Sequence, residues 1–447
     1  MRRLRDDQES LWEAVIPREW TLQGEWAILD TVLDDDRFLE PFAQRLESQI
    51  GRPTIPMERY LRMMVVKHRY GWGYETLVRE VADSISLRHF CRIPLGGPVP
   101  HSTTLIKLTR RFGPEVLEEL NRRLVETAVD RKLIRSTRLR LDTTVTEADI
   151  AYPTDSGLCA TAVRRLTKAV RLVKGAGLAT RTRFRDRQRA ARKLDSQSHH
   201  RAKGRDRSRR DIADEKTAQV QQLAAETVGE AREVLRNARR AVGTGGNIGS
   251  TWIDRLAREL QNAQRVLDQT AQRLAGVRSI PGRLVSMADP DARPIRRGKL
   301  RKPTEFGYKV AVGETAEGFV ASHATFVGNP PDTDTIGDIV GGALEAGIQI
   351  KSAFADRAFG DTPGDEAFAR YGIADVVVPR KGRPDPREQS RNWRRRYRFR
   401  SGIEGRISAL KRRFGLARTR LRGLNGARIW VGYGVFAHNL HQFAVLA

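Results

Sequence analysis

In the segment Arg138-Leu-Arg-Leu-Asp-Thr-Thr-Val-Thr146, leucine and valine alternate with charged or hydroxyl-bearing residues. A period of two is typical of a β-strand, because successive side chains of a strand point to opposite faces of its sheet. Residues 1–135 have apolar residues at helical spacing instead. The segment therefore predicts the first strand of a sheet, and this strand carries one carboxylate, Asp142.

The helices predicted before this strand are short and are separated by tight breaks. Apolar residues recur at helical spacing in 57–67, and Pro56 suits the first turn of that helix. Another helix is predicted over 114–129. Short helices rich in Arg and Lys occur both in DNA-binding domains and in purely structural bundles. We expect a helical DNA-binding domain over residues 1–135, with a structural bundle as the open alternative.

Residues 156–280 differ in composition from the segments on either side. Arg181–Lys216 is rich in Arg and poor in large apolar residues, which is typical of a mobile arm or of a helix ordered by a partner. Two amphipathic runs follow, separated by the glycine-rich segment 243–249, and they predict an antiparallel helical hairpin. We interpret the whole segment as a basic helical insertion in a surface loop, where long additions are tolerated.

Strands resume after Pro281 and alternate with helices. The pattern predicts strands over 306–313 and 318–327, a helix over 333–347, a strand over 350–356, a helix over 361–371 and a strand over 374–379. Without the insertion, this order is typical of an α/β fold with a mixed sheet flanked by helices. We expect this domain to comprise residues 136–155 and 281–447.

The end of the chain is strongly basic. From Arg391 to Arg428 there are 14 basic residues and one acid, Glu404. On a helix, Tyr397, Arg400, Glu404 and Lys411 would lie within a stripe about 60° wide. An apolar stripe on a neighbouring side of that helix would pack on a core; it consists of Phe399, Ile403, Ile407, Leu410 and Phe414. The simpler interpretation is a solvated helix with an ordinary i,i+4 ion pair between Arg400 and Glu404.

Three acids are thus expected on strands or on a helix facing them: Asp142, Asp356 and Glu404. Carboxylate oxygens are the ligands that hard divalent cations such as Mg²⁺ prefer. Two such ions can activate a nucleophile and stabilise the leaving oxygen of a phosphodiester. Each aspartate could instead cap a turn or form an ion pair. Five further acids could be mistaken for ligands: Asp149, Asp155, Asp332, Asp334 and Asp361.

Overall composition indicates a polyanionic partner. The 447 residues carry a net charge of +27, which favours nucleic acid, with an anionic membrane as the competing partner. No apolar stretch reaches the roughly 20 residues of a spanning helix, and residues 1–13 lack the apolar core of a signal peptide. Cys91 and Cys159 cannot form a disulfide framework or a zinc site by themselves, so we expect small buried side chains in a reducing cytoplasm.

Several motifs resemble one family. Tyr397-x2-Arg400-x3-Glu404-x6-Lys411 is similar to the signature around the last acid of bacterial insertion-sequence transposases of the DDE type, in the group like insertion-sequence family five. Leu141-Asp-Thr-Thr-Val resembles the strand of the first aspartate, and Phe354-Ala-Asp-Arg-Ala-Phe-Gly resembles the motif of the second. Lys302-Pro-Thr-Glu-Phe-Gly-Tyr-Lys309 and Tyr152-Pro-Thr-Asp-Ser156 also resemble segments of that group.

The resemblance implies a ribonuclease H-like catalytic domain with Mg²⁺, or Mn²⁺ as a substitute, bound by Asp142, Asp356 and Glu404. Tyr397, Arg400 and Lys411 would contact DNA beside the cleaved bond. The implied activity is cutting at terminal inverted repeats and strand transfer into target DNA by the freed 3′-hydroxyls. A homodimer in the bacterial cytoplasm, at the nucleoid when bound to DNA, is expected. Two alternatives remain: a catalytically inactive DNA-binding descendant, and a metal-dependent nuclease without strand transfer.

Overall fold

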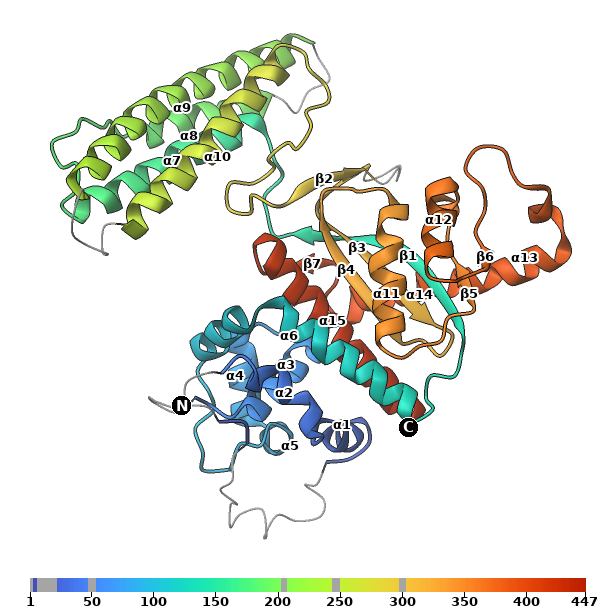
Figure 1. Ribbon diagram of the computed structural model, residues 1–447. Helices are drawn as coiled ribbons and strands as arrows, with labels where there is room; N and C mark the ends of the chain where they lie inside the picture. Colours follow the sequence, from blue (N-terminus) through green and yellow to red (C-terminus); the bar gives the residue numbers. More distant parts are fainter. Residues whose placement is uncertain (1–2, 6–21, 47–53, 202–206, 243–249, 297–302) are drawn as a thin grey trace. The chain divides into compact units, whose positions relative to one another are not determined.

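The computed structural model describes residues 3–5, 22–46, 54–201, 207–242, 250–296 and 303–447. The chain divides into two compact units (Figure 1). Unit 1 comprises residues 1–149 and 295–447, and unit 2 comprises residues 150–294. None of the helices within the described ranges is long and apolar enough to span a bilayer.

The N-terminal part of unit 1 is helical, as predicted. Its helices are α1 (Glu25–Leu33), η3 (Asp36–Phe38), α2 (Glu40–Ala43), α3 (Met57–Tyr70), α4 (Tyr74–Asp83), α5 (Ile85–Phe90) and α6 (Ser102–Asp130). Helix α6 changes direction at Gly113, whose φ of 72° is in the left-handed region, one residue before the start of the helix predicted over 114–129. Residues 1–2 and 6–13 of the segment examined for a signal peptide lie outside the described residues.

The second part of unit 1 contains a mixed sheet around β1. Its strands lie in the order β2-β3-β1-β5-β6, with β4 beside β3 and β7 beside β1. Strand β1 runs antiparallel to β3 and parallel to β5 and β7. The strands are β1 (Arg138–Ala148), β2 (Arg293–Arg296), β3 (Thr304–Thr315), β4 (Val320–Val327), β5 (Ser352–Phe354), β6 (Asp375–Val377) and β7 (Arg418–Thr419). The predicted α/β class is confirmed, whereas strands β2 and β7 were not predicted.

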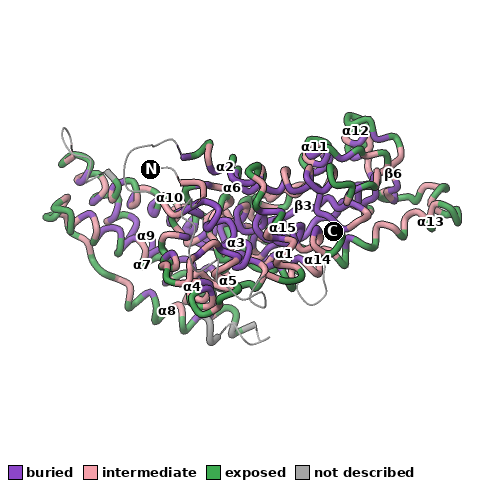
Figure 2. The backbone as a smooth tube through the Cα atoms, turned by 90° about the horizontal axis from the view of Figure 1, so that it is seen from below, coloured by how far each residue is buried: buried purple, intermediate pink, exposed green. Residues whose placement is uncertain are grey.

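Helices cover both faces of this sheet. Ala311 of β3 shares a core with Ile339 of α11, whereas Val312 of β3 shares a core with Leu410 of α14 and Val435 of α15. The elements after β4 are η4 (Asp332–Thr335), α11 (Ile336–Glu345), η5 (Arg357–Phe359), α12 (Thr362–Arg370), η6 (Pro386–Gln389), α13 (Arg391–Tyr397), η7 (Arg398–Ser401), α14 (Gly402–Arg413) and α15 (Gly423–Leu446). Figure 2 shows α3, α15 and β3 largely buried, whereas α13 has no buried residue.

Helix α15 joins the N-terminal helices to the sheet. The Tyr433 hydroxyl donates to the hydroxyl of Tyr60 in α3 at 2.9 Å, and the Asn121 side-chain amide of α6 donates to the carbonyl of Gly432 at 3.0 Å. One apolar core extends from Leu29 through the sheet to Phe443. The predicted domain boundary near residue 135 therefore falls inside a continuous core, and it stays a prediction.

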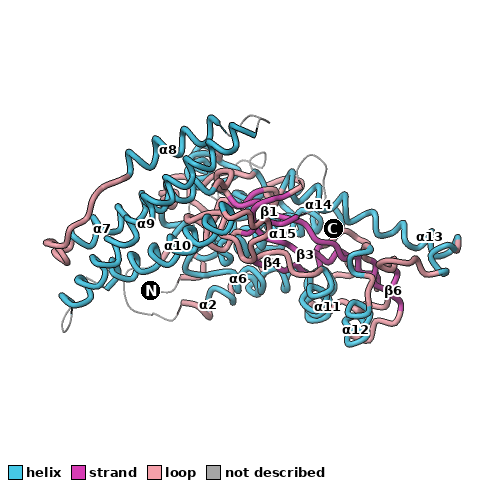
Figure 3. The backbone as a smooth tube through the Cα atoms, turned by 90° about the horizontal axis from the view of Figure 1, so that it is seen from above, coloured by secondary structure: helices cyan, strands magenta, loops and turns pink. Residues whose placement is uncertain are grey.

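The described residues of unit 2 form a helical bundle (Figure 3). Its helices are α7 (Asp155–Gly175), α8 (Gln188–Arg201), α9 (Arg207–Val242) and α10 (Ser250–Leu274). Ala191 of α8 is fully buried in the core of this bundle, so part of the Arg-rich segment forms a helix that packs without a partner molecule. The glycine-rich segment 243–249 lies outside the described residues.

Both cysteines have the predicted character. Cys91 and Cys159 are unpaired and buried. Burial raises the pKa of each thiol to about 12, which keeps both groups protonated near neutral pH.

Candidate active site

Strand β1 places Asp142 on the face of the sheet that α14 covers. Asp142 is paired with Val312 in the antiparallel register, and paired residues point to the same face. The side chain of Asp142 is 12% exposed, and its Oδ1 accepts a hydrogen bond from the Thr143 amide at 2.7 Å. The carboxylate is thus held on a rigid element while Oδ2 points to other partners.

The second and third acids lie near element ends. Asp356 follows β5 by two residues, and its Oδ1 accepts a hydrogen bond from the Ala358 amide at 2.8 Å, so it caps η5. Glu404 lies in the first turn of α14, and its side chain is 62% exposed. The capping role and the ligand role are compatible for Asp356, because its Oδ2 does not take part in the cap.

The single helix expected around Glu404 is corrected by the structure. Helix α13 ends at Tyr397, a 3₁₀ turn spans Arg398–Ser401, and α14 begins at Gly402. The backbone stays in the right-handed helical region throughout, so the side chains still follow one side. Of the predicted apolar stripe, Ile403, Leu410 and Phe414 are buried.

Arg400 connects two of the acids. Its Nη2 lies 3.1 Å from Asp142 Oδ2, and its Nη1 lies 2.7 Å from Glu404 Oε1. Burial alone would lower the pKa of Arg400, but the negative charges of Asp142, Asp356 and Glu404 raise it. The three predicted acids therefore act on one guanidinium, although they come from β1, the end of β5 and α14.

The two ion pairs of Arg400 differ in strength. The pair with Glu404 has the i,i+4 spacing of the simpler interpretation, and a pair with an exposed carboxylate stabilises by only about 0.3–0.5 kcal/mol. The pair with Asp142 is mostly buried, since the two side chains are 17% and 12% exposed. Breaking a buried pair costs about 3–5 kcal/mol. Glu404 can therefore leave Arg400 easily, whereas Asp142 cannot.

Asp142 and Asp356 line one cavity of about 410 Å³. Three cations also line it: Arg296, Lys309 and Lys381. Buried Lys309 forms an ion pair with Asp332, and Asp332 also accepts a hydrogen bond from the Thr143 hydroxyl at 3.0 Å. The site prediction did not include Lys309, although the motif that ends at this lysine was a usable signal.

Tyr397 lies near the same acids. Burial raises its pKa, Arg400 and Arg357 lower it, and Asp356 and Asp142 raise it. Its ring stacks on Trp393, with centroids 4.9 Å apart. Lys411 lies two turns after Glu404 on α14. Both side chains are partly exposed.

The donor chemistry of Asp142 and Asp356 suits a hard divalent cation, because both are carboxylates at one cavity. Glu404 would join this set only if it left Arg400, whose guanidinium binds both Glu404 and Asp142. Accordingly, the described residues contain no group of three acid, histidine or cysteine side chains that could hold a metal ion as they stand. The residues fit a metal site that would form when the weak ion pair between Arg400 and Glu404 breaks.

Three of the remaining acids have structural roles. Asp155 binds Arg283 at 2.8 Å within unit 2, and Asp361 caps α12 through the Gly364 amide at 3.0 Å. Asp332 begins η4 and in addition pairs with Lys309.

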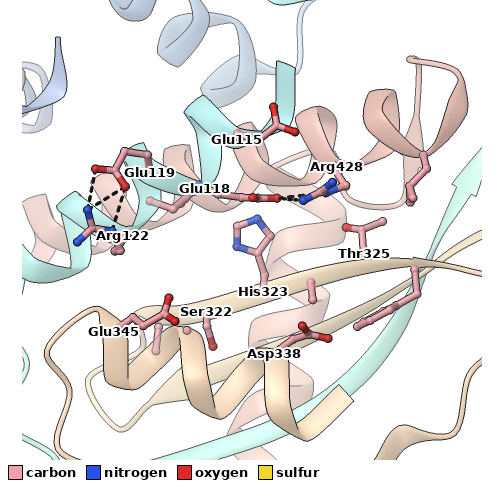
Figure 4. A pocket seen from close by; sticks show the side chains of 16 residues that line it. Glu115, Glu118, Glu119, Arg122, Ser322, His323, Thr325, Asp338, Glu345 and Arg428 are labelled. Carbon is pink, nitrogen blue, oxygen red and sulfur yellow. Dashed lines mark hydrogen bonds and ion pairs between the residues drawn. The ribbon is translucent and has the colours of Figure 1, made fainter. Parts of the chain in front are cut away.

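A second cavity of unit 1, of about 500 Å³, is unsuited to DNA phosphates (Figure 4). Five carboxylates line it: Glu115, Glu118, Glu119, Asp338 and Glu345. Burial and the charge of Arg428 lower the pKa of His323, another lining residue, to about 4, so the imidazole adds no positive charge near neutral pH. Arg122 and Arg428 also line the cavity, but the five carboxylates outnumber them, so the net negative charge of the lining would repel a polyanion.

Two family models match parts of the chain. Residues 265–440 match the family model described as Transposase DDE domain, and residues 13–111 match the model described as Transposase domain (DUF772). The first match contains Asp356 and Glu404, whereas Asp142 lies before it. An uncharacterized protein ORF8 in the nfe locus of Rhizobium meliloti is 30% identical over 125 residues, 27% of this chain and 60% of that protein. No solved structure matches the chain significantly.

Proposed function

Because the chain belongs to the DDE transposases of insertion-sequence type, we propose that it acts on the ends of its own element. It binds terminal inverted repeats, cuts phosphodiester bonds to free 3′-hydroxyls, and joins these ends to target DNA. Double-stranded DNA is the substrate both as terminal repeat and as target. The observation that carries the proposal is that Arg400 binds both Asp142 of β1 and Glu404 of α14, beside the cavity that Asp142 shares with Asp356.

The proposed fold of the catalytic part is ribonuclease H-like. Three antiparallel strands, β4, β3 and β1, are followed by two parallel ones, β5 and β6. Helices lie on both faces. Unit 2 interrupts the chain between β1 and β3, so it can vary in sequence without altering the register of the catalytic strands.

Asp142, Asp356 and Glu404 are the proposed ligands of Mg²⁺, with Mn²⁺ as a substitute. Bound divalent ions would lower the pKa of the attacking water and stabilise the leaving oxygen. The protein fixes two carboxylates on the sheet and keeps the third on a helix. Strand β1 holds Asp142 at the cavity, and the η5 turn holds Asp356 there.

The cations of α13 and α14 would position DNA. Arg400 releases Glu404, retains Asp142 and offers its free Nη1 to a phosphate oxygen. Tyr397 and Lys411 contact neighbouring phosphates, which fixes the register of the scissile bond. Two ends must be cut together for a transfer reaction, so we propose a homodimer in the complex with DNA.

The decisive experiment uses purified protein, labelled element ends and Mg²⁺. Glu404→Gln should abolish cutting while DNA binding stays at the wild-type level, because the amide keeps the shape but loses the charge. Glu345→Gln is the matched control, since this exposed glutamate of α11 lines the acidic cavity instead. Full cutting by Glu404→Gln would overturn the site assignment. Binding without cutting by the wild type would support an inactive descendant, and cutting without joining would support a nuclease.

A further inference from the structure

Unit 2 carries more positive charge than its length explains. Residues 150–294 contain 30 Lys and Arg against 15 Asp and Glu, a ratio of two to one, whereas the whole chain has 81 against 54. We infer that one face of unit 2 binds the sugar–phosphate backbone of duplex DNA, independently of base sequence. We call it the α7–α8 basic face, and it consists of Arg164, Lys168, Arg189, Arg192 and Lys193, which are all exposed.

These five residues lie on adjoining segments. Arg171 of α7 binds Asp186 at 2.5 Å, and the Ser156 hydroxyl of α7 donates to Asp195 of α8 at 2.7 Å. The chain from 186 to 195 therefore runs antiparallel to α7 between 171 and 156. This arrangement places the cations of α8 beside Arg164 and Lys168.

Several other arginines of the bundle are neutralised by acids of the bundle. Arg165 binds Glu259, and Arg187 binds both Glu226 and Glu230. By contrast, no member of the α7–α8 basic face forms an ion pair with an acid of the described ranges. Unpaired exposed cations on one side of a bundle attract a polyanion, because each phosphate contact releases condensed counterions.

The face is held on a packed scaffold. Ala191 is buried against the other helices, and the Ser198 hydroxyl donates to the carbonyl of Ala213 at 3.1 Å. The cations between these two anchors are therefore presented by an ordered helix, so binding does not require folding of an arm.

Duplex DNA fits this face better than an anionic membrane does. Peripheral membrane binding uses large apolar side chains beside the cations. Among the described residues, α7 and α8 carry no large exposed apolar side chain. The choice of DNA rests on the proposed function, which supplies duplex DNA as the substrate.

The test measures affinity of the full chain for a random-sequence duplex over a NaCl series, by fluorescence anisotropy. The test variant combines Arg164→Gln, Lys168→Gln and Arg192→Gln. The control removes the same charge elsewhere in unit 2 through Arg239→Gln, Arg240→Gln and Arg258→Gln, all exposed. The slope of log K against log[NaCl] should become shallower by roughly 3 in the test variant and by less than about 1 in the control.

Equal slopes for the wild type and the test variant would overturn the inference, as would equal losses in both variants. Liposomes of anionic phospholipid serve as a second probe, and stronger loss of liposome binding than of DNA binding would also overturn it. Cleavage of element ends is scored separately. If the wild type never cuts element ends but the test variant shows the shallower salt slope, only the proposed function is refuted. If the wild type cuts but the test variant keeps the wild-type slope, only this inference is refuted.

Discussion

Two arginine–carboxylate clusters connect β1 to the segment from η7 to α14, and they differ in exposure. In the first, Glu314 is 1% exposed and binds Arg140 at 3.1 Å and Arg406 at 2.8 Å. In the second, Arg400 binds Asp142 and the largely exposed Glu404. Arg140 and Asp142 are two residues apart on the same face of β1.

This difference in exposure distinguishes a cluster whose ion pairs are fixed from one in which an ion pair can break. Every charged group of the Glu314 cluster is buried or partly buried. If one of these groups left, the others would remain as buried charges without a partner. The Arg400 cluster has one exposed member that can leave at small cost. We expect the first cluster to determine stability alone, and the second, through the release of Glu404, to determine activity as well.

The largest effect is expected for Asp142→Asn. Cleavage of element ends should fall by roughly 10³-fold or more if this carboxylate supplies about 4 kcal/mol through a bound metal. DNA affinity should stay near the wild-type value, because the site cations remain. Cleavage assays and binding assays on the same preparation check this. Unchanged cleavage would show that the two clusters do not differ in function.

Glu314→Gln should act on stability instead. The change leaves two arginines without their carboxylate, and we expect the free energy of unfolding to fall by about 3–5 kcal/mol. Denaturant unfolding followed by fluorescence measures it. Whatever fraction of the variant stays folded should cut DNA at the wild-type rate; a folded but inactive variant would contradict the structural role of this cluster.

Gly402 tests how closely the first cluster packs on α14. A Cβ at this position would lie 1.8 Å from Arg140 Nη1, and Arg140 also donates to the Phe399 carbonyl at 3.1 Å. Gly402→Ala should therefore destabilise by about 1–3 kcal/mol. Gly405→Ala is the matched control in the same helix, since nothing lies within 4 Å of its Cβ, and it should stabilise by up to about 1 kcal/mol. Equal melting temperatures would contradict this geometry.

Lys67 extends the comparison to a buried cation that has no carboxylate in ion-pair range among the described residues. Its Nζ lies over the rings of Tyr74 and Trp430, each 4.7 Å away. Burial, assisted by the charge of Arg420, lowers the pKa of Lys67 from 10.5 to about 7. Between pH 7 and pH 10.5 the unfolded chain therefore binds more protons than the folded protein does. The free energy of unfolding consequently rises with pH in this range.

Lys67→Met should remove this contribution. The slope of stability against pH between 7 and 10.5 should decrease by at most about 1.4 kcal/mol per pH unit, the value for one proton. Unfolding of both proteins at several pH values gives the difference. An unchanged slope would show that Lys67 keeps its ordinary pKa.

Sequence periodicity predicted the strand that carries Asp142 and the strand that ends two residues before Asp356, because both have the alternating or apolar pattern of a covered sheet. It could not predict the 3₁₀ turn at 398–401, since spacings of three and four residues suit both helix types. Lys309 was missed because its ion pair with Asp332 depends on two segments that meet only in the fold. The ion pair of Arg400 with Glu404 was foreseen, but its second bond to Asp142 is a tertiary contact.

The continuous core of unit 1 also limits how such proteins can recombine by exchange of modules. The N-terminal helices share their core with α15, the last helix of the chain, so a grafted copy of these helices would expose Tyr60 and its apolar neighbours. Unit 2 has a separate core that includes Leu166, Val228 and Leu256. Unit 2 can therefore be moved to another protein as a module. The N-terminal helices can be moved only together with α15, because they share its core.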